Sequence, residues 1–528
     1  MPPFPYFWTV DHSLGLFSGV LLCVGTFMAF RAKSKKRVKR RLSFTSQIMA
    51  AGAWPNGFDM AEPIINAVLT FENLPSLSNI KSVIRQVMAY DRMGGACTRD
   101  SSGAWGFDPR TAPPTAGEVE KHLTVMEVAG EAALWAKAHE VCMCGLHALD
   151  KAKDPWWEFV LLKNTRSKTH AVIVRVHHTV GDGIALVGLV RAIMTDRHGK
   201  PIPDYFTVAS ERARAAANAG NGGGGLFGAL GFGLKVASAA VHCLTLGMSR
   251  YDSPLMFTAK DKKALKYSGK RRTLLLPDID LAFIKALKDK ATAKDGVRTT
   301  INDILFAATT GAIRRYCQAR DDPLLPPNDP AGNTPAADLQ LRALLPVSFP
   351  RKASITDTAR ALRNLWCMVS CPMPVGSGGV LGRLENTRKI TSQIKPPKSF
   401  VPLVQLWIQN HLLPKLPMFL SRQTCYDTFT RHSCIFTNVP GPPTPILWAG
   451  SEVKAMQMIF PNLISQISML SYGDVIHGNI VVDDHVVTNP ELFRSLFVEE
   501  LKEVADVLKV PFVTAIENRA KELAALKV

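Results

Sequence analysis

Residues 171–190 read AVIVRVHHTVGDGIALVGLV, and they give the strongest indication of the fold. The first six residues are mostly β-branched and apolar, which is typical of a buried strand. The apolar residues 184–190 at the end predict a helix. His177 and His178 are therefore expected on the turn between a strand and a helix, and such turns expose catalytic groups on a rigid frame.

Strand-like and helix-like stretches alternate along the rest of the chain. Residues 63–71 have strand character, and residues 79–88 have the apolar spacing of a helix. Further strands are predicted at residues 273–276, 341–347, 434–437 and 466–470, and a late helix is predicted to be capped by Asn489 and to start at Pro490. This alternation predicts an α/β fold.

The histidine motif, residues 177–183, joins a candidate proton acceptor to a nearby carboxylate, Asp182. A neutral imidazole, with an ordinary pKa of about 6.5, can take a hydroxyl proton near neutral pH and so act as a general base. The motif therefore predicts transfer of a chemical group to a hydroxyl or an amine. The alternative is that two histidines happen to precede a helix whose first turn carries Asp182, because carboxylates stabilise the positive end of a helix dipole.

The composition allows a large core and favours an anionic partner. The chain has 528 residues and is 47% hydrophobic, which is enough for two globular domains. Its 63 Lys and Arg against 44 Asp and Glu give a net charge of +19, which favours binding to polyanions. Eight of these cations lie in residues 31–41, directly after the apolar residues 14–30. A basic cluster in that place attracts anionic membrane lipid, so no nucleic acid partner is expected.

Residues 14–30 are predicted to be a membrane anchor. They carry no charge, and about 20 apolar residues suffice to cross a bilayer. Asp11 precedes them and the basic cluster follows, which is the reverse of the order in a cleaved signal peptide. The positive-inside rule then places the N-terminus in the lumen and the body of the protein in the cytosol. We predict a single-pass protein of the endoplasmic reticulum membrane; the alternative for this segment is a buried helix.

A second apolar stretch, residues 226–248, follows the glycine-rich residues 221–225. It is interrupted only by Lys235 and His242 and has no acidic residue. A lysine near the centre of a span costs roughly 2.5 to 3.5 kcal/mol, which argues against a full membrane crossing. We expect a helix that packs between lobes or lies at a membrane surface.

Signatures of metals and cofactors are missing from the sequence. Its ten cysteines form no Cys-x-x-Cys pair and have no zinc-finger spacing, so they are predicted to be thiols in a reducing compartment. No phosphate-binding P-loop and no dinucleotide fingerprint occur. We therefore expect no metal site and no bound cofactor.

Three further blocks accompany the histidine motif in a fixed order. They are residues 154–162, 300–305 and 437–442, with a weaker likeness around residues 270–272, Asn364 and residues 471–473. Together these blocks resemble the bifunctional wax ester synthase/diacylglycerol acyltransferase family, from near Pro55 to the C-terminus. The sequence departs from the family at Arg363, where the family usually has glycine.

The resemblance implies two chloramphenicol acetyltransferase-like α/β lobes with a substrate tunnel between them, preceded here by the membrane anchor. The predicted organisation is an anchor and basic segment at 1–45, a first lobe at 46–215, a glycine-rich linker and apolar crossover helix at 216–265, and a second lobe at 266–528.

The resemblance also implies an acyl-CoA-dependent O-acyltransferase, which moves a long-chain acyl group from acyl-CoA to a fatty alcohol or to diacylglycerol. His178 is the implied general base, and His177, its neighbour in the catalytic motif, is expected to be structural. Asp182 would hold the turn through an arginine or through backbone amides, and simple helix capping is the alternative. No Gly-x-Ser-x-Gly elbow occurs, which favours direct transfer over an acyl-enzyme.

Four more residues are implied to bind or frame the substrate: Gly183, Asn302, Asp303 and Asn438. A capping function is the alternative for Asn302, because it opens a predicted helix. Asn438 could donate a hydrogen bond to an oxyanion. The alternative is a structural role, because the Pro-Gly-Pro at residues 440–442 is typical of a rigid turn. The basic residues 270–272 could contact CoA phosphates or could simply be solvated.

Two other classes of protein share part of this pattern. A condensation-type enzyme acting on other thioesters would have the histidine motif, but it would be expected beside carrier or adenylation modules. A non-catalytic lipid-surface protein would have the anchor, but it would not need His178, Asp182, Asn302 and Asp303 together.

Overall fold

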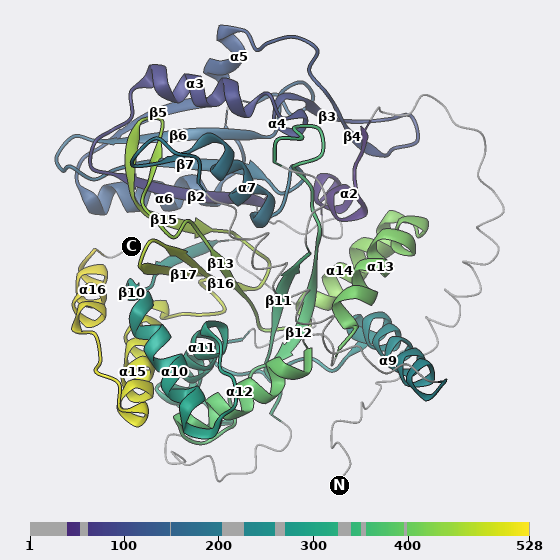
Figure 1. Ribbon diagram of the computed structural model, residues 1–528, viewed down its shortest axis with the longest axis vertical. Helices are drawn as coiled ribbons and strands as arrows, with labels where there is room; N and C mark the ends of the chain where they lie inside the picture. The colour runs from purple at the N-terminus through teal and green to yellow at the C-terminus, as the bar shows by residue number, and fades with distance from the viewer. Residues whose placement is uncertain are drawn as a thin grey trace.

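The computed structural model describes residues 40–52, 62–147, 149–202, 226–258, 270–325, 339–349, 355–394 and 399–526. In these residues, two seven-stranded sheets and one three-stranded sheet form the framework, and helices cover the two large sheets (Figure 1). The predicted α/β fold with two lobes is confirmed.

The first lobe is built on a sheet with the strand order β5-β6-β7-β2-β15-β14-β8. Its strands are β2 (Ile64–Phe71), β5 (Leu123–Val128), β6 (Trp157–Asn164), β7 (His170–His177), β8 (Thr195–Asp196), β14 (Ile446–Trp448) and β15 (Ser451–Ile459). β7 pairs with β6 on one side and with β2 on the other, and both pairings are antiparallel. This central place explains its almost unbroken apolar run, because a strand covered on both faces needs no polar alternation.

Helices and a small sheet complete the first lobe. The helices are α2 (Phe44–Ala51), α3 (Leu77–Val87), α4 (Asp91–Gly94), α5 (Ala116–Lys121), α6 (Glu131–Met143) and α7 (Gly183–Ile193), and the small sheet is β1 (Arg40–Arg41), β3 (Ala96–Arg99) and β4 (Trp105–Asp108). The helix predicted at 79–88 is α3, and α7 includes the one predicted at 184–190. In the core, the ring of Trp448 lies 5.5 Å from that of Phe159 and 5.9 Å from that of Phe71.

The second lobe has the strand order β10-β17-β16-β13-β11-β12, with β9 also paired to β17. Its strands are β9 (Arg271–Leu275), β10 (Ile279–Asp280), β11 (Arg342–Ser348), β12 (Trp366–Pro372), β13 (Cys434–Pro440), β16 (Ser465–Tyr472) and β17 (Val475–Asp483), and its main helices are α10 (Leu281–Asp295), α11 (Ile301–Gln318), α12 (Val380–Ile394), α15 (Pro490–Leu508) and α16 (Thr514–Ala525). α15 begins at Pro490 as predicted, but the side chain of Asn489 makes no capping hydrogen bond, which corrects the expected cap.

The chain crosses back from the second lobe to the first. After β13 it forms β14 and β15, which pair with β8 and β2 of the first sheet, and it then returns to form β16 and β17. Asn479 on β17 donates to Gln457 Oε1 on β15 over 3.0 Å, so the two sheets are also joined side by side. Residues from the range predicted for the second lobe thus complete the first sheet.

A third group of helices lies at the side of the second lobe (Figure 1). It consists of α9 (Leu226–Thr245), α13 (Val401–His411) and α14 (Met418–Thr430), with the short 3₁₀ helices η1 (Leu246–Met248) and η2 (Leu413–Lys415). α9 packs against α13, and η1 packs against α14. The apolar stretch at residues 226–248 is therefore helical, as expected.

The structure tests only some of the membrane predictions. None of the helices in the described ranges is long and apolar enough to cross a bilayer, and this includes α9. The predicted anchor at residues 14–30 and the glycine-rich residues 221–225 lie outside the described residues, so both stay predictions.

Candidate active site

His178 lies one residue beyond the end of β7, where the two lobes meet. Its backbone N–H donates to the carbonyl of Pro63 over 2.7 Å, which ties the histidine turn to the start of β2. The N–H of Val180 donates to the carbonyl of His177 over 2.9 Å and closes the turn. The imidazole therefore stands on the rigid frame that the sequence predicts.

The side chain of His178 is held by Asn364, which comes from the other lobe. Asn364 is buried just before β12, and its Oδ1 lies 2.9 Å from His178 Nδ1. Its Nδ2 donates to the carbonyl of His178, and also to Ser46 Oγ over 2.9 Å. Trp366 Nε1 donates to the same Oδ1 over 3.2 Å. One buried amide thus joins the histidine turn, α2 and the start of β12.

These contacts determine which ring nitrogen of His178 carries the hydrogen. An indole N–H can only donate and a backbone carbonyl can only accept, so the Trp366 indole and the His178 carbonyl set the orientation of the Asn364 amide. The Oδ1 that faces the imidazole can only accept, and His178 Nδ1 must therefore carry the hydrogen. In the neutral ring, Nε2 then has the lone pair that a general base needs.

The surroundings of His178 keep its ring neutral. Its centroid lies 5.5 Å from the ring of Trp366 and 5.7 Å from the ring of Phe460. Burial lowers the pKa of His178 below its ordinary value, while the negative charge of Asp182 and the hydrogen bond with Asn364 oppose this change. The ring is therefore neutral near neutral pH, and an imidazolium formed during a reaction would be stabilised by Asp182.

His177 has a different environment, inside the first lobe. Its Nδ1 accepts from the N–H of Thr179 over 3.2 Å and lies 2.7 Å from Thr179 Oγ1. Its ring packs edge-on against Trp156, with 4.9 Å between centroids. Burial, with a smaller effect of His178, lowers the pKa of His177 to about 3. A buried neutral ring with these contacts fits the structural role expected for it.

Asp182 connects the histidine turn to the second lobe through backbone amides. Its Oδ1 accepts from the N–H of Ala185 over 2.9 Å and caps α7. Its Oδ2 accepts from the N–H of Leu365 over 2.8 Å. Because Leu365 follows Asn364, this carboxylate also places the amide that holds His178. One side chain thus combines the two alternatives, since it caps the helix and holds the turn.

A half-buried arginine on α4, Arg92, supports the same turn. Its Nη1 donates to the carbonyls of Thr179 and Val180 over 3.3 and 3.2 Å. Burial and the charge of Arg363 lower the pKa of Arg92 to about 10, although Asp182 partly offsets them. No local pattern in the sequence marks Arg92, because the contact joins segments that are far apart along the chain.

The close backbone approach at this turn is made by Gly181. A Cβ there would lie 3.2 Å from the Ala185 side chain and 3.8 Å from the backbone nitrogen of Arg363. The carbonyl of Arg363 accepts from the N–H of Asp182 over 3.5 Å. The contact uses the backbone of Arg363, so an arginine can stand where the resemblance leads one to expect glycine.

Asn302 and Asn438 lie together at a second position. Asn438 Nδ2 donates to Asn302 Oδ1 over 2.6 Å and joins β13 to the start of α11. Asn302 is exposed and is not the helix cap, because Thr300 caps α11 in a capping box with Asp303. Buried Asp303 also accepts from Thr391 Oγ1 over 2.7 Å. The capping alternative for Asn302 is therefore wrong, and the Asp303 carboxylate holds the start of the helix.

The predicted site residues thus fall into two groups. His178, Asp182 and Gly183 share the β7–α7 turn, and Gly183 is the first residue of α7, where an added Cβ would meet no atom within 4 Å. Asn302, Asp303 and Asn438 belong to α11 and β13 of the second lobe.

Arg271 and Arg272 are engaged in ion pairs within the second lobe. Arg271 pairs with Asp483 at 2.5 Å, and both side chains are buried. Arg271 also donates to the carbonyl of Asn462 over 2.8 Å, and Arg272 pairs with Glu491. Arg271 therefore has a structural role, which corrects its suggested contact with CoA phosphates.

Within the ranges that the structure describes, no group of three or more histidine, cysteine or acidic side chains is placed to hold a metal ion. The nine cysteines in those ranges are free, and burial raises the pKa of Cys97 and of Cys142 to about 12. Both are therefore thiols, not thiolates, near neutral pH.

Two family models match this chain. The wax ester synthase/diacylglycerol acyltransferase catalytic domain matches residues 125–305, and the WS/DGAT C-terminal domain matches residues 363–505. The chain belongs to the wax ester synthase/diacylglycerol acyltransferase family. The first match contains His178 and the second contains Asn364, so both sides of the contact described above fall inside the regions that define the family.

Curated relatives in the family come from bacteria and plants. A putative diacylglycerol O-acyltransferase of Mycobacterium tuberculosis is 25% identical over 395 residues, which cover 69% of this chain and 70% of the relative. Wax ester synthase/diacylglycerol acyltransferase 11 of Arabidopsis thaliana is 22% identical over 371 residues, which cover 66% of this chain and 73% of the relative. The protein is an O-acyltransferase, and the family predicted from its motifs is confirmed.

Solved structures show the same fold. The alignment with the wax ester synthase/diacylglycerol acyltransferase from Marinobacter aquaeolei VT8 covers 89% of this chain and 100% of the Marinobacter chain, with a TM-score of 0.55 and 16% identity. The first condensation domain of the calcium-dependent antibiotic synthetase covers 92% of this chain and 99% of its own, with a TM-score of 0.52 and 13% identity. The two-lobe architecture is therefore common to WS/DGAT enzymes and condensation domains.

Proposed function

We propose that this O-acyltransferase moves a long-chain acyl group from acyl-CoA to a fatty alcohol, to diacylglycerol, or to both. The observation that carries the proposal is the contact between His178 and Asn364, which leaves the lone pair on Nε2. The family adds the choice of acceptor, because the relatives are named as wax ester synthases and diacylglycerol acyltransferases.

His178 acts as the general base in the proposed reaction. Its Nε2 takes the proton of the acceptor hydroxyl while the hydroxyl oxygen attacks the carbonyl carbon of the thioester. The new C–O bond forms first, and the C–S bond of the tetrahedral intermediate then breaks. The CoA sulfur leaves and takes the proton back from Nε2. The products are an ester and CoA thiol, and the imidazole returns to its starting form.

Asn364 and Asp182 position the base and stabilise its charged form. His178 Nδ1 keeps its hydrogen and donates it to Asn364 Oδ1 throughout, because only Nε2 exchanges a proton. Burial lowers the pKa of His178, and the negative charge of Asp182 offsets part of this lowering, so Asp182 favours the imidazolium of the intermediate.

Gly183, Asn302, Asp303 and Asn438 are proposed to bind or frame the substrate. An amide nitrogen has two hydrogens, and Asn302 accepts one of those on Asn438 Nδ2. We propose that the other is donated to the oxyanion of the intermediate, a type of contact worth about 3 to 4 kcal/mol. Asp303 contributes indirectly, because it holds the start of the helix that carries Asn302.

We place the enzyme at the endoplasmic reticulum membrane, with residues 14–30 as a single-pass anchor. The body then faces the cytosol, where acyl-CoA is available, and membrane lipid is a partner. The support is the uncharged run followed by eight cations in residues 31–41.

Parallel acceptor assays with purified full-length protein test the reaction. Long-chain acyl-CoA is supplied with a fatty alcohol, with diacylglycerol, or with a small amine, and both released CoA thiol and acylated product are measured. We expect ester formation that requires an alcohol or diacylglycerol. Product from the amine alone would instead favour a condensation-type activity.

A further inference from the structure

Several large apolar side chains are exposed on the helices at the side of the second lobe. They are Leu234, Val241 and Leu244 on α9, Leu403 and Trp407 on α13, and Phe419 on α14, and we call these six residues the apolar face. Trp407 is 59% exposed, and Leu234 and Phe419 are each 68% exposed. Single exposed apolar residues are ordinary, but a contiguous group of large ones marks an interaction site.

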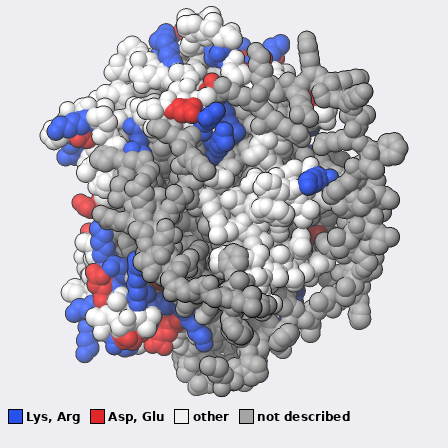
Figure 2. All heavy atoms as spheres, turned by 45° about the vertical axis from the view of Figure 1, so that its right-hand side comes forward, with Lys and Arg blue, Asp and Glu red and all other residues white. Residues whose placement is uncertain are grey.

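The apolar face belongs to one layer of helices. Leu234 and Val241 have the i, i+7 spacing that puts both on one side of α9, and Leu403 and Trp407 have the i, i+4 spacing on α13. α9 packs against α13, and its continuation η1 packs against α14. Figure 2 turns this side of the molecule forward and shows a broad white area with few charged side chains.

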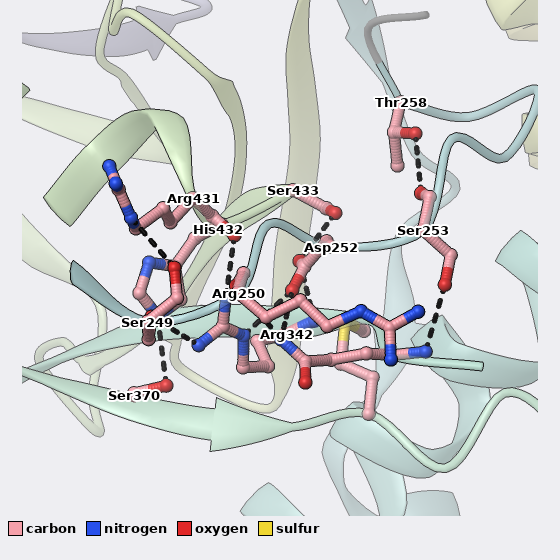
Figure 3. Close-up of polar contacts among 12 residues, drawn as sticks. Ser249, Arg250, Asp252, Ser253, Thr258, Arg342, Ser370, Arg431, His432 and Ser433 are labelled. Atoms are coloured by element: carbon pink, nitrogen blue, oxygen red, sulfur yellow. Dashed lines mark hydrogen bonds and ion pairs between the residues drawn. The ribbon is translucent and has the colours of Figure 1, made fainter. Parts of the chain in front are cut away.

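A buried ionic network fixes this layer to the second sheet (Figure 3). Arg342 of β11 donates to Asp252 Oδ1 over 2.7 Å and to Ser249 Oγ over 2.9 Å. Arg431, just after α14, donates to the carbonyl of Ser249 over 2.7 Å and lies over the ring of Tyr251 at 4.5 Å. The C-terminal ends of η1 and α14 are therefore clamped together, and the apolar face is carried by rigid helices.

The charges beside the apolar face are positive. Residues 226–248 and 399–426 contain Lys235, Lys415 and Arg422 but no aspartate or glutamate. Lys235 and Lys415 are exposed. Asp427 is the first acidic residue after this stretch, and it pairs with Arg431 at 3.6 Å. An apolar surface bordered by cations matches the boundary between acyl chains and anionic headgroups.

We propose that the apolar face is a docking site for a phospholipid surface that contains anionic headgroups. Trp407 and Phe419 enter the acyl boundary, where an indole is favoured because its N–H stays near water. Lys235 and Lys415 extend to the headgroup phosphates. The proposal depends neither on the predicted anchor at residues 14–30 nor on which acceptor the enzyme uses.

Hydrogen exchange followed by mass spectrometry tests the site on the full-length protein without any need for turnover. Exchange is compared in buffer, with phosphatidylcholine vesicles, and with vesicles that also contain phosphatidylserine. We expect peptides of α9, α13 and α14 to exchange more slowly with the anionic vesicles, while peptides of α3 and α15 are unchanged. Unchanged exchange in α9, α13 and α14 would overturn the proposal, even if another segment holds the protein on the vesicle.

Matched variants test whether the slower exchange depends on the apolar face itself. Trp407→Gln combined with Phe419→Gln should abolish the slowing, because it removes apolar area that the lipid would bury. Leu77→Gln combined with Leu324→Gln removes two side chains that are 48% and 43% exposed elsewhere, and it should behave like the parent.

Two further readouts complete this experiment. Both double variants should transfer acyl groups to dispersed acceptor at the parental rate, so failure of docking and failure of the proposed chemistry are distinguishable. Slowing that survives in the Trp407 and Phe419 variant would overturn the proposal. Slowing that appears without vesicles and increases with protein concentration would identify a second copy of the chain as the occupant, and it would overturn the proposal equally.

Discussion

The proposed base, His178, is oriented by an amide, and this has a physical consequence. A carboxylate in the place of Asn364 would hold the same tautomer of His178 but would add a negative charge beside the ring. That charge would raise the pKa of the imidazole and keep more of it protonated near neutral pH. Asn364 orients the ring without this charge, so burial can hold the pKa of His178 below its ordinary value.

His178→Ala should lower kcat by roughly 10²- to 10⁴-fold, which is the usual contribution of a general base. The melting temperature should change little, because the ring is not part of the apolar core. His485→Ala is the matched control, since His485 is exposed and outside the site, and it should keep parental activity. Equal kcat in His178→Ala and the parent, at equal folded protein, would remove the proposed mechanism.

The pH dependence of kcat tests the role of Asn364. The base acts when neutral, so kcat should rise with pH through the pKa of His178, and this rise should be complete near neutrality because burial lowers that pKa. Asn364→Asp should move the rise to higher pH by about one unit or more, because it adds a negative charge. Asn364→Ala should lower kcat without shifting the rise of kcat to higher pH. A profile for Asn364→Asp that coincides with the parent would show that the residue does not act through the imidazole.

Helix α7 is held at its start by Asp182, which also reaches the second lobe. Asp182→Ala should destabilise the protein by about 2 to 3 kcal/mol, from the lost cap and the unpaired N–H of Leu365. Asp280→Ala is the control, because Asp280 caps α10 through Phe283 in the same way. It should cost about 1 kcal/mol, and only Asp182→Ala should also lower turnover. Urea denaturation of both variants measures the loss of unfolding free energy, and kcat of both variants measures the loss of turnover. Equal losses in the two variants would show that Asp182 does no more than cap its helix.

Helices α11 and α15 approach each other closely at Gly311. A Cβ there would lie 2.0 Å from Glu500, whose carboxylate pairs with Arg315 and Arg383. Gly311→Ala should therefore displace Glu500 and destabilise the protein by about 1 to 3 kcal/mol or more. Gly382→Ala on α12, where an added Cβ meets nothing within 4 Å, should instead be neutral or stabilise slightly. A parental melting temperature for Gly311→Ala would show that the two helices can separate freely.

For the whole molecule, the main prediction is which side of the membrane the protein body faces. Residues 14–30 are expected to anchor the protein with the body around His178 in the cytosol, because the cations follow the apolar run. Protease added to sealed microsomes should therefore digest the body without detergent. Protection of the body until detergent is added would show the opposite orientation. Deletion of the residues before Leu42 should reduce attachment only in part, since the apolar face would remain.

The local elements and the family can be predicted from the amino-acid sequence alone. The strand before His177 and the helix after Asp182 follow from apolar periodicity, which depends only on neighbouring residues. The order of the motif blocks was enough to identify the family, and thereby the two-lobe fold and an O-acyltransferase activity.

The contacts that complete the site emerge only when the chain is folded. In the sequence, Asn364 is only part of a weak resemblance to the family, and no pattern marks Arg92. In the structure, both residues hold the histidine turn from distant parts of the chain. The insertion of β14 and β15 into the first sheet was equally hidden, because strands pair through backbone groups that every residue shares. The exposure of Trp407 and Phe419 was hidden too, since an apolar helix has the same sequence whether its face is covered or open. The spacing of apolar residues determines local helices and strands because it depends only on residues that are near in sequence. The contacts described here depend instead on how the two lobes pack.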